Sequence, residues 1–164
     1  MIKVQDLIGK PIVTMNHGEI IGKAKDVLID PSTFEIAALV LPASKMFGKE
    51  TMVIPRPVIH VLGRDVILVK SNEVMVRDNT LRGVASLLAV AKQMKGRQIA
   101  TEKGTKVGIL NDILVDDAGK IVGYDLSKVF IKGPVSQSKR IPFRMTRSIG
   151  PDLIIVDSKQ LELI

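Results

Sequence analysis

The feature that most constrains this chain is an internal repeat. The stretch GKAKDVLID (22–30) returns 86 positions later as GILNDILVD (108–116). The match extends outward over two further pairs of segments: 8–41 with 95–126, and 54–71 with 141–158. The single-residue gaps that the alignment needs fall in turn-like sequence, where changes of length cost little. Matches in apolar segments with gaps in loops indicate that one fold is present twice.

Each copy is predicted to consist of short β-strands. Apolar runs such as PIVTM, DVLID and DVILVK alternate with turn sequences such as NHGE and LGRD. That spacing is typical of a small antiparallel barrel or sandwich. Gly22 and Gly108 lie inside strand-like sequence, where a glycine usually marks a bulge or a bend. The triplets VLI (27–29) and ILV (113–115) predict a strand that is covered on both faces, because neighbouring side chains point to opposite sides.

The segment between the copies predicts an amphipathic helix over residues 77–95. Apolar residues recur there at helical spacing: Leu81, Val84, Leu87, Leu88, Ala91 and Met94. We therefore predict a first barrel over 1–76, the connecting helix, and a second barrel over 96–164. The sequence leaves open whether the two barrels pack against each other.

The same ordered series of motifs occurs in both copies. A Gly-x-x-x-Asp step leads into three apolar residues and a second Asp, and an apolar strand, an Ile-Pro pair and a closing Gly-x-Asp follow. The series covers residues 7–70 and again 94–157, which is most of the chain. In this order the motifs resemble those of the PRC-barrel family. Its members include the cytoplasmic portion of the photosynthetic reaction centre H subunit and the C-terminal domain of a ribosome maturation factor.

The resemblance implies a fold and a class of role. In both relatives the barrel is a docking piece and is not itself an enzyme. We expect this chain to have neither the transmembrane helix of the H subunit nor the separate N-terminal domain of the maturation factor. We therefore predict a mainly β protein, made of two small antiparallel PRC-type β-barrels joined by an amphipathic helix, with a binding or scaffolding role.

Several function classes are excluded or disfavoured by composition. The chain has no cysteine, which excludes disulfides, thiolate catalysis and iron–sulfur ligation and suits a reducing compartment. The first residues do not have the pattern of a signal peptide, and no apolar stretch approaches the roughly 20 residues of a transmembrane helix. We expect a cytoplasmic protein.

Residue types that carry acid–base or metal chemistry are sparse. His17 lies in a turn and His60 among apolar neighbours, and neither belongs to a metal-binding spacing. Asp26 and Asp112 occupy equivalent positions, and we expect each to accept backbone hydrogen bonds near a strand bend. Asp116, like its counterpart Asp30, is expected to open a turn. The sequence predicts no catalytic residue, no metal site and no cofactor.

The strongest functional signal is basic charge in the second copy. Of the net charge of +7, residues 1–78 contribute +1 and residues 79–164 contribute +6. Residues 126–151 contain no acid and six cations: Lys128, Lys132, Lys139, Arg140, Arg144 and Arg147. This run includes IKGPVSQSKR (131–140), which is predicted to be a mobile, exposed loop. The low aromatic content of 3% disfavours reading of single-stranded RNA by base stacking.

These observations favour a non-catalytic adaptor that binds a protein or ribonucleoprotein partner. The basic second barrel would make the electrostatic contact, and the near-neutral first barrel would dock or form a homo-oligomer. The alternative is a peripheral membrane-associated factor that contacts anionic lipid through the same basic barrel. No small-molecule substrate is expected.

Overall fold

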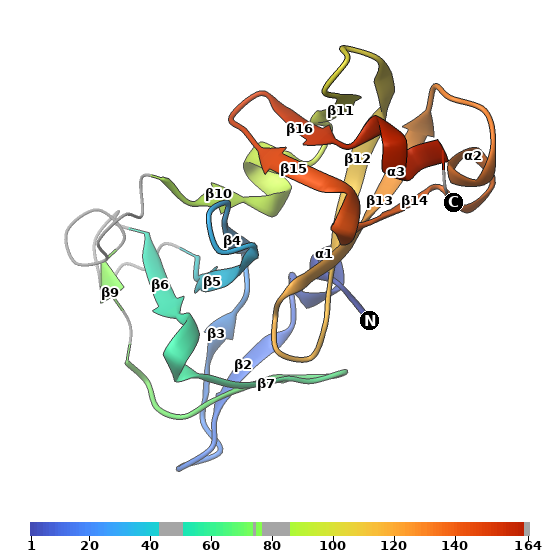
Figure 1. Ribbon diagram of the computed structural model, residues 1–164. Coiled ribbons are helices and arrows are strands. Elements are labelled where there is room, and N and C mark those ends of the chain that lie inside the picture. Colours follow the sequence, from blue (N-terminus) through green and yellow to red (C-terminus); the bar gives the residue numbers. More distant parts are fainter. Residues whose placement is uncertain (43–50, 74, 77–85, 163–164) are drawn as a thin grey trace.

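The protein is mainly β. A computed structural model describes residues 1–42, 51–73, 75–76 and 86–162 (Figure 1). The described strands form three sheets, with seven, five and four strands. The two copies of the repeat have matching strand orders, as the alignment predicts.

The first copy is built on two sheets. The four-stranded sheet has the order β3-β2-β8-β7, and the five-stranded sheet has the order β10-β4-β5-β6-β9. The elements of this copy are β2 (Pro11–Thr14), β3 (Ile20–Lys23), β4 (Asp26–Asp30), β5 (Glu35–Val40), β6 (Met52–Pro55), the 3-10 turn η2 (Arg56–Val58), β7 (Ile59–Leu62), β8 (Ile67–Val69) and β9 (Met75–Val76).

The second copy is built on one sheet with the order β14-β13-β12-β11-β16-β15. Its elements are β11 (Gln98–Thr101), β12 (Lys106–Val115), β13 (Ile121–Val129), α2 (Pro134–Ser138), β14 (Arg140–Pro142), the 3-10 turn η5 (Phe143–Met145), β15 (Thr146–Ile149), β16 (Leu153–Val156) and α3 (Ser158–Glu162). The long strand β12 takes the place of both β3 and β4, so that the two sheets of the first copy are one sheet here. Gly108 lies next to irregularities in the pairing of β12 with β11 and with β13, and a Cβ atom there would come within 2.4 Å of the Lys128 carbonyl oxygen.

The prediction of closed antiparallel barrels needs correction. The sheets are not closed barrels, and each copy contains one parallel pair: β2 with β8, and β11 with β16. The parallel pairing arises because β8 returns beside β2, and β16 beside β11, and each runs in the same direction as its partner. The repeat predicts the strands themselves, but the direction of pairing depends on the path of the connections.

The predicted connecting helix is wrong for its described part. Residues 77–85 lie outside the described residues. Beyond them, β10 (Leu88–Ala89) is a strand that pairs with β4, and η4 (Val90–Met94) is a single π-helical turn. Pairing with the edge of β4 has overridden the helical spacing of the apolar residues. Within the described part of the chain, no helix is long and apolar enough to cross a membrane.

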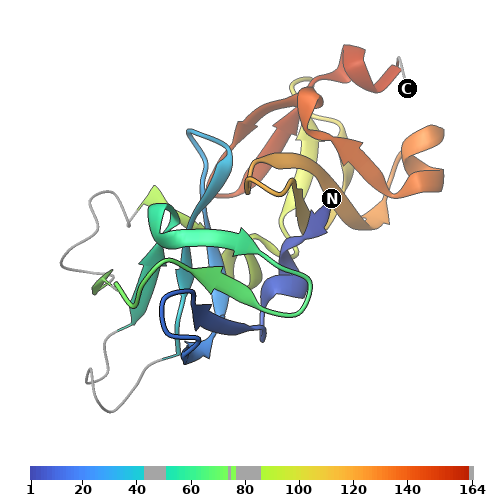
Figure 2. The same cartoon turned by 90° about the horizontal axis from the view of Figure 1, so that it is seen from below.

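Each copy lends its leading segment to the other. The first residues of the chain form β1 (Ile2–Lys3) and the helix α1 (Val4–Leu7), and β1 pairs with β12 of the second copy. The equivalent strand of the second copy, β10, pairs with β4 of the first copy. Both views show the N-terminal segment beside the second copy (Figures 1 and 2).

A second reciprocal contact joins the two β-turns that follow β4 and β12. The backbone N–H of Ile36 donates to the carbonyl oxygen of Gly119 at 2.8 Å, and the N–H of Ile121 donates to the carbonyl oxygen of Phe34 at 3.0 Å. Ile36 and Ile121 are equivalent residues, and each donates to the turn of the other copy. Together with the leading segments, these bonds relate the copies by an approximate two-fold symmetry.

The copies share one hydrophobic core. The main cluster of buried side chains includes Val27 and Ile29 from β4 and Ile113 and Val115 from β12. Leu28, which points to the other face of β4, is fully buried in a second cluster. The prediction that the central strand is covered on both faces is confirmed, and the two copies pack against each other.

Candidate binding surface

The six predicted cations are all exposed, but the fold does not bring them together in one cluster. Four lie on β13, on β14 or on the connection between these two strands: Lys128, Lys132, Lys139 and Arg140. Arg144 follows in η5, and Arg147 lies on β15, at the opposite end of the sheet order from β14. The sequence run is therefore divided between two edges of the sheet.

The predicted mobile loop contains a short helix, α2. Gly133 has a φ of 109° at the start, Pro134 occupies the first turn, and Val135 is buried. Lys139 ends the helix in the left-handed region with a φ of 55°. The loop prediction missed this element because five residues are too few to show a helical period. The buried valine fixes the position of the neighbouring cations.

Two of the six cations face carboxylates that lie just outside the acid-free run. Arg140 Nε lies 3.7 Å from Asp125 Oδ1, and Arg147 Nη2 lies 3.0 Å from Asp157 Oδ2. A third cation, Lys128, lies 5.4 Å from the ring centre of Phe130, which is 46% exposed. The charge pattern of the sequence does not reveal these two ion pairs, because the register of the strands decides which cation lies beside which carboxylate.

The other three cations have no ion pair within the described residues: Lys132, Lys139 and Arg144. Lys132 and Lys139 flank α2 on its two sides, and Arg144 lies on η5. Exposed cations without a partner are available to an anionic ligand, whereas Arg140 and Arg147 would first have to leave their carboxylates.

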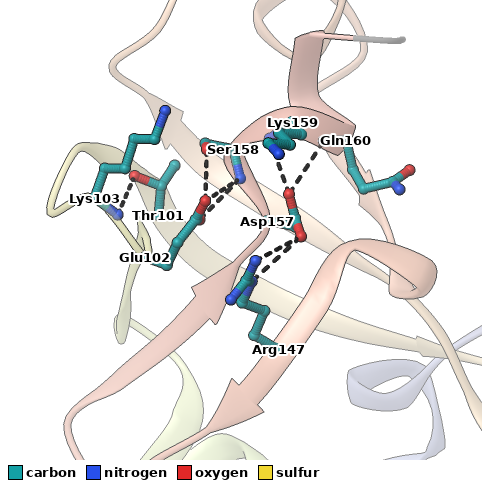
Figure 3. A network of polar contacts seen from close by, with 8 residues as sticks. All are labelled: Thr101, Glu102, Lys103, Arg147, Asp157, Ser158, Lys159 and Gln160. Carbon is teal, nitrogen blue, oxygen red and sulfur yellow. Dashed lines mark hydrogen bonds and ion pairs between the residues drawn. The ribbon is translucent and has the colours of Figure 1, made fainter.

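Arg147 belongs to a polar network that holds the helix α3 (Figure 3). The Glu102 carboxylate accepts hydrogen bonds from the backbone N–H of Ser158 at 2.9 Å and from its hydroxyl at 2.6 Å, which lower the pKa of Glu102. Burial acts to raise the pKa of Asp157, but hydrogen bonds from Arg147 and from the backbone N–H groups of Lys159 and Gln160 outweigh it, so the pKa is lowered. The role of Arg147 here is structural.

An apolar hollow of about 370 Å³ opens beside β14. Its lining consists mainly of apolar residues from the N-terminal segment, β12, β13, α2 and β14: Met1, Leu114, Val122, Gly123, Pro134, Ser138, Arg140, Ile141 and Pro142. A second hollow of about 540 Å³ shares Met1, Leu114 and Arg140 with it, and its lining also includes Lys3, Lys10 and Arg64. An apolar slot therefore adjoins a region with an excess of positive charge, although Asp6 and Asp117 line this second hollow as well.

The equivalent carboxylates Asp26 and Asp112 bind the leading segments. Asp26 accepts hydrogen bonds from the backbone N–H groups of Ala91 and Lys92 at 2.9 and 3.0 Å, and Asp112 accepts one from Gln5 at 3.1 Å. Burial raises the pKa of Asp112, and its hydrogen bonds act in the opposite direction. The prediction that these residues accept backbone hydrogen bonds is confirmed. The donors, which belong to the other copy in each case, were not foreseen.

The other residues singled out in the sequence lie in a turn or on the exposed surface. The Asp116 carboxylate accepts hydrogen bonds from the N–H groups of Ala118 and Lys120 and so closes a turn, as predicted. His17 and His60 are exposed. Among the described residues, no group of three or more His, Asp or Glu side chains is arranged to hold a metal ion.

Comparison with protein families agrees with the duplicated architecture. A family model described as PRC-barrel domain matches residues 1–76 and again residues 91–163. A comparison with curated proteins finds no match. The two matched stretches cover most of the chain and coincide with the two copies that the repeat defines, and the protein therefore belongs to the PRC-barrel domain family.

Proposed function

We propose that this protein is a non-catalytic adaptor of the cytoplasm that binds a protein or ribonucleoprotein partner through its second copy. The observation that carries the proposal is the set of exposed cations on and beside α2 that lack an ion pair within the described residues. Lys132 and Lys139 flank α2, which buries Val135, and Arg144 lies on η5, which buries Met145. A rigid support that presents unpaired charge suits electrostatic recognition of an anionic surface.

Sedimentation of the tagged protein from native lysate tests this proposal. Co-migration with large particles that is lost after nuclease or at high salt would support a ribonucleoprotein partner. Loss at high salt alone would favour an acidic protein. Migration as a small free species under every condition would contradict the adaptor proposal.

A charge-matched pair of variants separates a specific surface from general basicity. The test variant replaces Lys132, Lys139 and Arg144 with Gln, and the control replaces the exposed first-copy residues Lys23, Lys25 and Lys70 with Gln. We expect the test variant to lose co-migration and its salt dependence, and the control to keep both. Equal losses would show that net charge alone is responsible.

One observation favours the membrane alternative as a second candidate. Phe130 is 46% exposed and lies between Lys128 and Lys132, and an exposed aromatic ring among cations suits the interface of an anionic bilayer. Flotation with vesicles that contain phosphatidylserine, at low and high salt, tests this candidate. A Phe130→Ser variant should reduce flotation if the ring enters the interface, and a lack of flotation at low salt would remove the candidate.

A further inference from the structure

The two copies differ at one sheet edge. In the first copy, β6 lies between β5 and β9, and β9 pairs antiparallel to it with Val53 opposite Met75. The counterpart of β6 in the second copy is β14. Among the described residues, β14 pairs only with β13. Within the part of the chain that the structure describes, no strand lies beside β14 as β9 lies beside β6.

The backbone of β14 is oriented as that of β6 is. Leu41 N–H donates to the Met52 carbonyl oxygen at 2.8 Å, and the equivalent Leu126 N–H donates to the Lys139 carbonyl oxygen at 2.8 Å. Because bonding directions alternate along an antiparallel strand, the N–H and C=O of the next residue point away from the sheet. That residue is Val53 in β6 and Arg140 in β14.

A single hydroxyl group occupies the outward backbone positions of Arg140. Ser138 Oγ accepts a hydrogen bond from the Arg140 N–H at 3.2 Å and donates one to the Arg140 carbonyl oxygen at 3.3 Å. In the first copy, β9 lies along the equivalent groups of Val53. Both of these bonds to Ser138 are long and exposed, so that an incoming strand can displace them at small cost.

The two copies also differ in the residues on the sheet face next to this edge. Four positions that are buried and apolar on the sheet face beside β6 are charged or exposed on the face beside β14: Val40 is replaced by Asp125, Val53 by Arg140, Leu87 by Met1 and Ala89 by Lys3. The apolar slot beside β14 lies on this face. The change opens a face that is closed in the first copy and places cations at its rim.

We propose that the edge of β14 and the adjoining slot bind an extended segment of a partner protein, which adds to the sheet as an antiparallel strand. Backbone hydrogen bonds to Arg140 supply the pairing, and an apolar side chain enters the slot beside Val122 and Pro142. An acidic side chain of the segment meets Arg140 and Lys3, in keeping with the positive rim. This inference rests on the proposed adaptor function and specifies the chemistry of the partner.

The chain itself provides the probe. The probe is a synthetic peptide with the sequence of residues 71–78, SNEVMVRD. It contains Met75 and Val76, which pair with β6, and an acid, Glu73, directly before its three apolar residues. We would titrate it into the full-length, isotope-labelled protein and follow the backbone amides by NMR. We expect saturable shifts centred on Arg140, Val122 and Leu114, with slower exchange of the Arg140 amide proton.

A matched pair of variants tests the slot. Val122 is 38% exposed on β13 beside the slot, and Val61 is 41% exposed on β7. A Val122→Glu substitution should weaken peptide binding about tenfold or more, because a carboxylate replaces an apolar contact at the centre of the site. The Val61→Glu control should bind as the parent protein does. Equal effects of the two substitutions would overturn the slot assignment.

Ser138→Ala gives an independent measurement of the edge. Removal of the hydroxyl leaves the outward groups of Arg140 without their intramolecular partner, so the peptide should bind more tightly than it binds the parent protein. Unchanged affinity would show that the hydroxyl does not compete for this edge.

The failures of the two proposals can be told apart. A lack of saturable shifts at millimolar peptide, or shifts centred on Met52 and Val53 where β9 pairs, would overturn strand addition at β14 while leaving the adaptor proposal to the sedimentation test. If the peptide binds at β14 but the protein sediments as a free species, strand addition is supported and the adaptor proposal falls.

Discussion

At the scale of single residues, two buried aspartates hold the copies together. Asp112 is 3% exposed and receives the N–H of Gln5, and Asp26 is 7% exposed and receives those of Ala91 and Lys92. Each carboxylate therefore caps the first turn of a short helical segment that belongs to the other copy. Equivalent residues with equivalent roles explain why both copies have an aspartate at this position of the central strand.

We predict that Asp112→Ala lowers the free energy of unfolding by about 1–2 kcal/mol, because it removes a cap and leaves buried N–H groups without an acceptor. Asp65, whose side chain is 76% exposed, is the control, and Asp65→Ala should change stability by less than about 0.5 kcal/mol. Urea unfolding followed by circular dichroism measures both. Equal changes would show that the cap contributes nothing.

At the scale of elements, the central strands β4 and β12 are alike in sequence but differ in cover. Leu28 of β4 lies in a closed apolar cluster, whereas its counterpart Leu114 of β12 lines the open slot. Truncation of a side chain in a closed cluster leaves a cavity, but truncation beside an open hollow only enlarges that hollow. The two strands are similar in sequence because of the duplication. Because their surroundings differ, we expect truncation of a side chain to destabilise the protein more in β4 than in β12.

Leu28→Ala should lower the free energy of unfolding by about 2–5 kcal/mol, and Leu114→Ala should lower it by less. The comparison of denaturant midpoints at constant m-value measures the difference. A larger loss for Leu114→Ala would contradict the open slot beside β14.

The helix α3 is expected to respond to acid. The folded pKa values of Glu102 and Asp157 are lowered, so their contribution to stability is present above the unfolded pKa values and is lost as the pH falls through the folded ones. The amide proton of Ser158 should exchange faster at acidic pH than at neutral pH, after correction for the intrinsic rate. A Glu102→Gln variant should show a smaller change. If parent and variant respond alike, the carboxylate does not control the docking of α3.

At the scale of the whole molecule, the two copies share one core and exchange their leading segments. The leading segment of each copy lies on the sheet of the other, and the main core draws on both copies. We therefore expect a destabilising mutation in one copy to lower the stability of both copies.

We predict one cooperative thermal transition, with equal calorimetric and van't Hoff enthalpies. Asp112→Ala should shift this single transition as a whole, because the lost cap joins both copies. Two resolved transitions, with only one shifted by the substitution, would show that the copies unfold independently.

The sequence by itself determined the duplication, the short strands, the turns opened by Asp30 and Asp116 and the burial of both faces of the central strands. These features depend on local patterns in the sequence, and each pattern occurs in both copies, which supports its interpretation. Only the tertiary structure decided that the leading segments cross between copies, that Arg140 and Arg147 meet carboxylates and that the edge of β14 differs from that of β6. The physical reason is that these contacts join residues far apart in the chain, and they depend on which strand edges are open once the sheets have formed.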